Sequence, residues 1–171
     1  MRDFQTPLSD EDIGQLHVGD MIMLSGYIYT GRDAVLPKLV RMIEDGSIED
    51  TGLCLQGGVI FHTAVSPAGV GPTSSNKAEI EGSFSGLSRG GIKLHLGKGK
   101  ISEETVRILQ RYNAVYAVIP PVTALLADRT KEQRVVAFPE EGMEAMHQLK
   151  VERYPCIIAA VNGQSIYDKG Q

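Results

Sequence analysis

Short apolar stretches with the two-residue period of β-strands alternate along the chain with longer stretches that have the helical period. The pattern predicts strands over residues 21–29, 59–62, 92–96, 114–119, 135–138 and 156–161. It predicts helices over residues 34–44, 102–112 and 141–148, with shorter ones after Ser9 and after Pro120-Pro121. Asn162-Gly163 is a two-residue hairpin signal that returns the chain through residues 165–167. We therefore expect an α/β protein with a mixed central sheet.

Length and composition suit one globular domain, because 42% of the 171 residues are hydrophobic and 22% are charged. We expect that domain to cover residues 1–171, with residues 1–19 as its N-terminal lead-in. Every apolar run is shorter than the roughly 18 residues of a membrane helix, and the first residues lack a signal-peptide pattern. These features predict a cytoplasmic protein without membrane contact. The net charge of −4 argues against nucleic acid as a partner.

The two cysteines, Cys54 and Cys156, lie far apart in the sequence and form no CxxC pair. Two thiols are too few to hold a structural zinc ion or an iron–sulfur cluster. We expect both to be reduced and mostly buried. Any metal cofactor would need most of its ligands from another chain.

Three loops rich in glycine, hydroxyl groups and basic residues follow predicted strands, at residues 29–33, 69–77 and 96–100. If these strands are parallel, the loops meet at one edge of the sheet, where α/β proteins bind their ligands. The side chains that would meet there are Thr30, Arg32, Thr73, Ser74, Ser75, Lys77 and Lys98, with Lys100 as a further candidate. Such a set suits a small anion with more than one carboxylate or phosphate.

Each loop also has a plainer interpretation, as a surface Arg–Asp pair, a capping segment or an exposed basic turn. A phosphate-binding loop does not fit, because five residues separate Gly91 from Gly97 and Lys98 is followed by Gly99. The histidines form no recognisable triad or metal spacing. We expect His62 and His95 to be satisfied core residues, and His17 and His147 to lie in exposed helical segments.

Four separated motifs resemble one family. Residues 19–33 (GDMIMLSGYIYTGRD) look like the strand and turn that open the β-subunit of class I fumarases and L-tartrate dehydratases. Residues 71–75 (GPTSS) resemble that family's Gly-Pro-Thr-Thr-Ser loop, and residues 97–100 (GKGK) resemble its Gly-Lys-Gly motif. Residues 154–159 (YPCIIA), followed by Asn162-Gly163, look like its closing strand and hairpin. The motifs agree in order and spacing over nearly the whole chain.

This resemblance implies a swivelling β/β/α domain and the reversible addition of water to a small unsaturated dicarboxylate. It implies a partner α-subunit with three cysteines and a [4Fe-4S] cluster, whose open iron acts as a Lewis acid on the leaving hydroxyl. This chain would bind no metal itself. We expect it to work with that α-subunit and a dicarboxylate such as fumarate, malate or tartrate, and to form a dimer.

The resemblance also assigns roles by position. Arg32 would bind a substrate carboxylate, Lys98 would be a second cationic contact, and Thr73 would abstract the proton. Thr30, Ser74 and Lys77 complete the expected substrate contacts. Leu36 stands at the position where the family has histidine, and Lys77 stands where the family has arginine. Lysine cannot make the planar two-pronged contact with a carboxylate that arginine makes.

Two other functions compete with a hydro-lyase subunit. One is a non-catalytic paralogue that binds or senses a dicarboxylate, which the change at Leu36 favours and the retained Arg32, Thr73 and Lys98 oppose. The other is a phosphate- or nucleotide-binding domain, which the loop spacing opposes.

Overall fold

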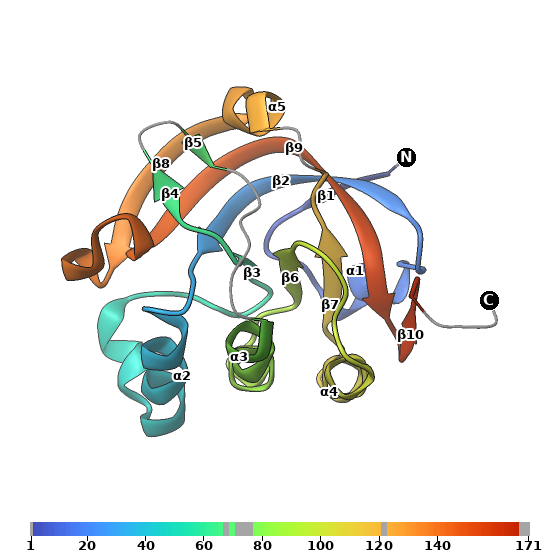
Figure 1. Cartoon of the computed structure of the whole chain (residues 1–171), viewed down its shortest axis with the longest axis horizontal. Helices are drawn as coiled ribbons and strands as arrows, with labels where there is room; N and C mark the ends of the chain where they lie inside the picture. Colours follow the sequence, from blue (N-terminus) through green and yellow to red (C-terminus); the bar gives the residue numbers. More distant parts are fainter. Residues whose placement is uncertain (1, 67–68, 71–76, 121–122, 168–171) are drawn as a thin grey trace.

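The structure is a computed structural model that describes residues 2–66, 69–70, 77–120 and 123–167. Its strands form an arch over a row of three helices, which Figure 1 shows end-on at the bottom of the view. These helices are α2 (Leu36–Asp45), α3 (Lys77–Arg89) and α4 (Glu103–Arg111). Two shorter helices, α1 (Asp10–Gly14) and α5 (Thr123–Asp128), lie apart from that row.

One mixed sheet contains eight of the strands. In spatial order they are β1 (Arg2–Gln5), β2 (Met21–Thr30), β3 (Val59–Phe61), β6 (Leu94–Gly97), β7 (Val115–Val118), β9 (Met146–Val161) and β10 (Gln164–Ser165), with β8 (Thr130–Ala137) paired to β9. The pairs from β1 to β7 are parallel, and β9 is antiparallel to its neighbours. Two short strands, β4 (Val65–Ser66) and β5 (Gly69–Val70), form a separate hairpin.

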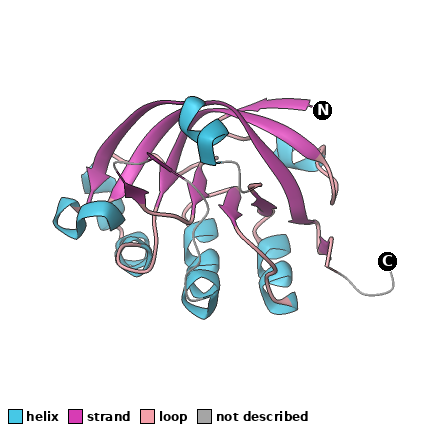
Figure 2. Ribbon diagram, turned by 45° about the horizontal axis from the view of Figure 1, so that its top comes forward, coloured by secondary structure: helices cyan, strands magenta, loops and turns pink. Residues whose placement is uncertain are grey.

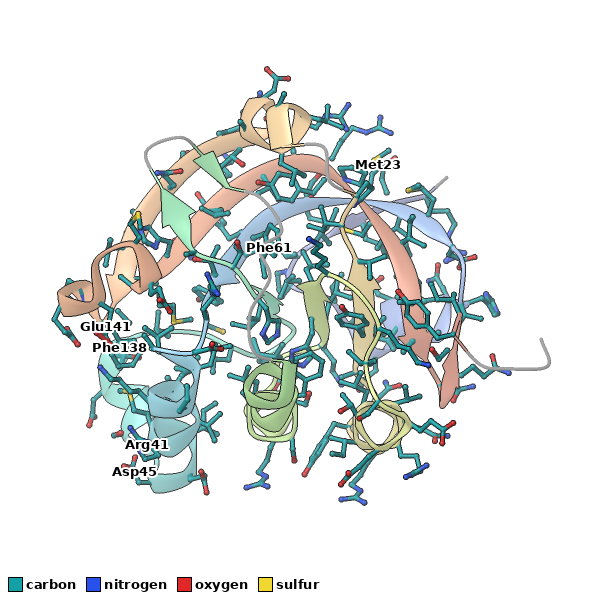
Figure 3. The ribbon with its side chains drawn as sticks, in the orientation of Figure 1. Met23, Arg41, Asp45, Phe61, Phe138 and Glu141 are labelled. Atoms are coloured by element: carbon teal, nitrogen blue, oxygen red, sulfur yellow. The ribbon has the colours of Figure 1, made fainter. Side chains whose placement is uncertain are left out.

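The sheet closes on itself because β2 pairs with β9 as well as with β3. The circuit runs β2–β3–β6–β7–β9 and back to β2. A buried apolar cluster with members from all five strands lies inside it, including Leu24, Phe61, Leu96, Ala117 and Ile158. Figure 3 shows Phe61 under the arch of strands.

Helices cover the outer side of β3, β6 and β7. The remaining buried residues form two further clusters that join this side of the sheet to the helices, one containing Ile60 and Leu39 and the other containing Tyr116 and Val106. The layers are therefore strand, strand and helix, as Figure 2 shows. This arrangement confirms the predicted α/β class with a mixed sheet. Among the described helices, none has the length and apolar character needed to cross a membrane.

The helix ends follow from local sequence. Ser9 begins α1 with a capping box, in which its hydroxyl accepts from the Asp12 N–H and the Asp12 carboxylate accepts from the Ser9 N–H. Ser102 caps α4 in a similar way by accepting from the Thr105 N–H. Gly46 ends α2 with φ 82°, a left-handed conformation in which glycine is favoured.

The predicted helix over residues 141–148 is wrong. A 3₁₀ segment, η2 (Pro139–Glu144), occupies its first half, and β9 begins at Met146. Gly142 interrupts the segment with φ 61° and ψ −122°, and the following residues pair with both β2 and β8. His147 is consequently a buried strand residue and not an exposed helical one.

Helix α3 was not predicted from the sequence. Its two inner glycines weaken the helical signal, since each costs about 1 kcal/mol relative to alanine in a helix interior. One of them has a packing reason: a Cβ atom on Gly86 would lie 2.5 Å from Cγ1 of Val40 in α2. Gly90, just past the end of α3, is similarly close to Ile43. The small residues therefore let α3 pack directly against α2.

Candidate functional site

Strands β2, β3 and β6 are adjacent and parallel, so their carboxyl ends lie at the same edge of the sheet. The register places Thr30 beside Phe61 and Phe61 beside Leu96. The ladder continues one residue further, because the Gly31 N–H donates to the Phe61 carbonyl at 3.1 Å and the His62 N–H donates to the Leu96 carbonyl at 2.9 Å. The first and third of the predicted loops are therefore brought together.

Arg32 lies in the turn between β2 and α2. Its carbonyl accepts from the N–H groups of Val35 and Leu36, which starts the helix directly after the turn. Gly31 leaves no room for a side chain, since a Cβ atom there would lie 2.7 Å from Cδ2 of Leu36. Arg32 itself is half-buried. Leu36, at the position where the related family has histidine, is fully buried in the apolar cluster beneath this turn.

Segment η2 supports the same turn from the side. Oε1 of Glu144 accepts from the Ala34 N–H at 3.4 Å, and Nζ of Lys38 lies 3.1 Å from Oε2 of Glu141. The Lys38 ammonium also lies 5.6 Å from the centre of the Phe138 ring. In Figure 3, Phe138 and Glu141 flank one end of α2, whereas Arg41 and Asp45 lie toward its other end. The sequence pattern gave no sign of these contacts, because residues 141–148 were expected to be helical.

Lys98 lies in the turn that follows β6, and its side chain is exposed. The Tyr116 hydroxyl donates to the Gly99 carbonyl at 2.8 Å, and the Ile119 N–H donates to the Gly97 carbonyl at 3.2 Å. A Cβ atom on Gly97 would lie 3.2 Å from the Tyr116 ring. The tyrosine on β7 therefore supports the glycine-lysine-glycine turn from below.

Thr30 is the last residue of β2 and is fully buried. Its hydroxyl accepts from the His147 N–H at 3.3 Å, across the pairing of β2 with β9. The hydroxyl is thereby engaged inside the protein. Its expected role as a substrate contact stays a prediction.

The remaining predicted site residues are less fully placed. Lys77 begins α3, but its side chain is not among those described. Thr73 and Ser74 lie outside the described residues. Their roles stay predictions, as do those of Arg32 and Lys98.

Two histidines form a buried hydrogen-bonded chain just below the same edge. Nε2 of His62 lies 3.2 Å from Nδ1 of His95, and Nε2 of His95 lies 2.9 Å from the Ser88 hydroxyl on α3. The Phe84 ring stacks on His95 with ring centres 4.3 Å apart. Burial lowers the pKa of His62 to about 3 and also lowers the pKa of His95 well below its usual value, so both rings are neutral.

His95 is the satisfied core residue that was expected, but His62 is not fully satisfied. Its Nδ1 atom is buried and has no hydrogen-bond partner within the described part of the chain. The Oδ1 atom of Asp33, in the turn after β2, has the same property. The sequence alone could not reveal this, because the pairing of His62 with His95 depends on the register of β3 against β6.

The cysteines do not form a metal site. Cys54 is exposed, in contrast to the expectation that both thiols would be mostly buried, whereas Cys156 lies in the core. Burial raises the pKa of the Cys156 thiol to about 12, which keeps it protonated. No group of three His, Cys, Asp or Glu side chains that could hold a metal occurs within residues 2–66, 69–70, 77–120 and 123–167. The described side chains thus do not fit an iron–sulfur cluster.

Comparison with known proteins decides the family. The sequence model described as "Fumarase C-terminus" matches residues 2–170, which is nearly the whole chain. The chain belongs to the fumarase C-terminus family. The resemblance drawn from the four motifs is thereby confirmed.

Relatives of this fumarase C-terminus domain include separate subunits and parts of longer proteins. The chain is 32% identical over 177 residues to a Methanocaldococcus jannaschii protein provisionally named L(+)-tartrate dehydratase subunit beta, covering 95% of this chain and 89% of the relative. It is 28% identical to the L(+)-tartrate dehydratase subunit beta of Escherichia coli, covering 92% and 81%. It is also 28% identical to fumarate hydratase 2 of Leishmania major, of which it covers only 29%. The family domain therefore occurs both as a β-subunit and as one part of a longer hydratase.

Proposed function

We propose that this chain is the β-subunit of an iron–sulfur-dependent hydro-lyase, which adds water to or removes it from a small dicarboxylate together with a cluster-bearing α-subunit. One observation carries the proposal: Arg32 and Lys98 follow parallel strands that flank β3 at one edge of the sheet, in a domain of the fumarase C-terminus family. Fumarate/malate and tartrate are the candidate substrates, because relatives of both kinds are named for them.

The spacing of the two cations suits such a substrate. The ends of β2 and β6 lie two strand spacings apart, about 10 Å. Arginine and lysine side chains are long enough to span much of that gap, so in this proposal each contacts one carboxylate of a four-carbon dicarboxylate. Arg32 is held in a tight turn, whereas Lys98 is exposed on a glycine-flanked turn. The arginine thus provides the oriented contact and the lysine provides a more adaptable one.

Thr73 carries the proton transfer in this proposal, by its position in the family motif. A threonine hydroxyl is a poor base unless nearby cations and amide groups stabilise its alkoxide. Lys98 and Lys77 supply positive charge for that purpose. The chain's described residues do not fit the cluster ligands, so we assign the cluster to the α-subunit and derive no step through it.

The test is co-expression with the cluster-bearing subunit under anaerobic conditions, followed by assays with fumarate, malate and tartrate. The wild-type complex should turn over at least one of them. Arg32→Gln should lower kcat/KM by about a hundredfold, mainly through KM, because a buried charged contact is worth roughly 2–3 kcal/mol. Thr73→Ala should lower kcat far more than it changes KM.

Arg41→Gln is the matched control for Arg32→Gln. Arg41 is exposed on α2 and lies toward the end of that helix opposite η2 (Figure 3). The control should leave kcat and KM near wild-type values. A stable complex that turns over none of the three substrates would contradict the proposal and favour a non-catalytic dicarboxylate-binding paralogue.

A further inference from the structure

The hydrogen-bonded series His62–His95–Ser88 has no role in the substrate contacts or the proton transfer proposed above. We propose that His62 is a positioning residue of the site, held by His95 and Ser88 so that its Nδ1 atom hydrogen-bonds to a hydroxyl group at the carboxyl end of β3. This inference rests on the proposed hydro-lyase function and adds to it a residue that the family motifs do not include.

The first support is the place of His62 in the sheet. It continues β3 by one residue, between the strands that lead to Arg32 and Lys98. The residues level with it on the two neighbouring strands are Gly31 and Gly97. Neither glycine has a side chain, so the imidazole is the only side chain at this level of the three strands. His62 therefore lies on the middle strand of the three, just below the edge where the proposed site is formed.

The second support is the buried Nδ1 atom of His62, which lacks a hydrogen-bond partner among the described residues. His62 as a whole residue is only 2% exposed. A buried polar atom without a partner costs roughly 1–3 kcal/mol, and such atoms are rare in folded proteins. The buried Oδ1 of Asp33, at the end of the adjacent strand, has the same property. Two such atoms at one edge indicate that a polar group binds there.

The third support is the way the ring is held. Its other nitrogen contacts His95, His95 contacts Ser88, and the Phe84 ring packs against both imidazoles. The ring therefore cannot turn without breaking a buried hydrogen bond. Burial lowers the pKa of His62 to about 3, so the free atom belongs to a neutral ring. A hydroxyl suits a neutral imidazole in either tautomer, because it can both donate and accept.

The hydroxyl has two possible sources, which are the substrate and the protein. Malate and tartrate carry hydroxyl groups, whereas fumarate carries none. If the substrate supplies the hydroxyl, loss of the contact raises KM for malate and leaves KM for fumarate unchanged. If the protein supplies it, kcat falls in both directions and both KM values stay unchanged. A generally weakened fold lowers the amount of active complex and leaves KM unchanged for the surviving molecules. The first pattern differs from this in KM, and the second differs once kcat is expressed per active site.

Two substitutions separate the two nitrogens of His62 in the complex with the cluster-bearing subunit. His62→Gln keeps a polar group near the position of Nε2 and loses the one at Nδ1. His62→Asn keeps a polar group near Nδ1 and loses the contact with His95. We expect His62→Gln to raise KM for malate, or to lower kcat in both directions, by about tenfold, which is the effect of one lost buried hydrogen bond. His62→Asn should recover part of that loss. His17→Gln, at an exposed histidine outside the site, is the control.

The amount of folded complex is measured by cluster absorbance and thermal unfolding, so that kcat refers to active sites. Two results would overturn the inference: His62→Gln kinetics within about twofold of wild type, or equal losses in the His62→Gln and His62→Asn variants. In both cases turnover by the wild-type complex would still support the proposed function. A wild-type complex without turnover would overturn both. If His62→Gln does not assemble, Ser88→Ala decides, because it leaves both rings in place; unchanged kinetics there would also overturn the inference.

Discussion

Nε2 of His62 lies 3.2 Å from Nδ1 of His95, and both rings are buried between the sheet and α3. The pair has consequences for stability as well as for the site. Neither ring can take up a proton without placing a charge in a low-dielectric interior beside the other ring. The unfolded chain has no such restriction.

The stability of the protein should therefore fall when the pH is lowered below about 6.5. Burial lowers the pKa of His62 to about 3 in the folded protein, whereas the same imidazole in the unfolded chain has its ordinary pKa of about 6.5. Stability from this residue is present above that value and is lost as the pH falls toward 3. At pH 5 the loss is about 2 kcal/mol for His62, and His95 adds to it in the same direction.

Urea unfolding at pH 7.5 and pH 5 measures this loss as a shift in the midpoint. The His62→Gln variant should show a smaller shift than the wild type, because one of the two buried imidazoles is gone. His17→Gln should keep the wild-type shift, since His17 is exposed. A midpoint that does not change between the two pH values would show that the rings are accessible to protons.

The two cysteines should react at very different rates. Cys54 is exposed, whereas Cys156 is buried with a pKa raised to about 12. Iodoacetamide at pH 8 should modify one thiol per chain in the native protein and two in urea. Mass spectrometry of the digested protein identifies the modified residue. The Cys54→Ser variant should react only after unfolding, and rapid native labelling of Cys156 would contradict the buried position on β9.

The glycines of α3 should respond in opposite ways to alanine. At Gly86 a Cβ atom would lie 2.5 Å from Cγ1 of Val40, so Gly86→Ala should destabilise the protein by about 1–3 kcal/mol. At Gly82 nothing lies within 4 Å, so Gly82→Ala should stabilise it by up to about 1 kcal/mol through helix propensity. Thermal unfolding distinguishes the two.

A double substitution tests the cause of the first effect. Val40→Ala removes the methyl groups that the new Cβ atom would meet. The double variant Val40→Ala/Gly86→Ala should therefore be more stable than the sum of the two single losses in stability predicts. Strict additivity would mean that α2 and α3 do not pack through this pair.

The Lys98 turn should depend on the hydroxyl of Tyr116. Tyr116→Phe removes the hydrogen bond to the Gly99 carbonyl while keeping the ring under Gly97. One such bond is worth about 1 kcal/mol, so substrate KM in the complex should rise about fivefold with little change in kcat. Tyr27→Phe, at an exposed ring on β2, is the control. Equal kinetics for the two variants would mean that the turn holds its shape without this contact.

Much of the fold was predictable because local signals agreed with the final structure. Ser9 and Ser102 correctly predicted the starts of two helices, and Asn162-Gly163 correctly predicted the hairpin that joins β9 to β10. The parallel strands that bring Arg32 and Lys98 to one edge followed from the alternation of strands and helices. These features depend on a few neighbouring residues each.

The features that could not be predicted depend on distant partners. The sequence predicted a helix over residues 141–148 and a separate strand over residues 156–161. The structure instead has one strand from Met146 to Val161, which passes through Pro155 and the left-handed Arg153 (φ 53°). In the structure, β8 pairs with β9 as far as Val151, and β7 pairs with it from Ile157 onward. Between these two pairings one side of β9 has no strand beside it among the described residues. A proline, which lacks an N–H, is tolerated there.

The closure of the sheet by β2 and β9 also determines the order in which the protein can be made. Thr30 pairs with His147, so the closed sheet cannot form until the chain has been synthesised as far as His147. At roughly 5–20 residues per second, β2 waits on the order of ten seconds for its partner. During that time Leu24 and Ile28, fully buried in the finished protein, have no core to enter. The apolar face of β2 therefore stays without its β9 partner until that strand has been synthesised.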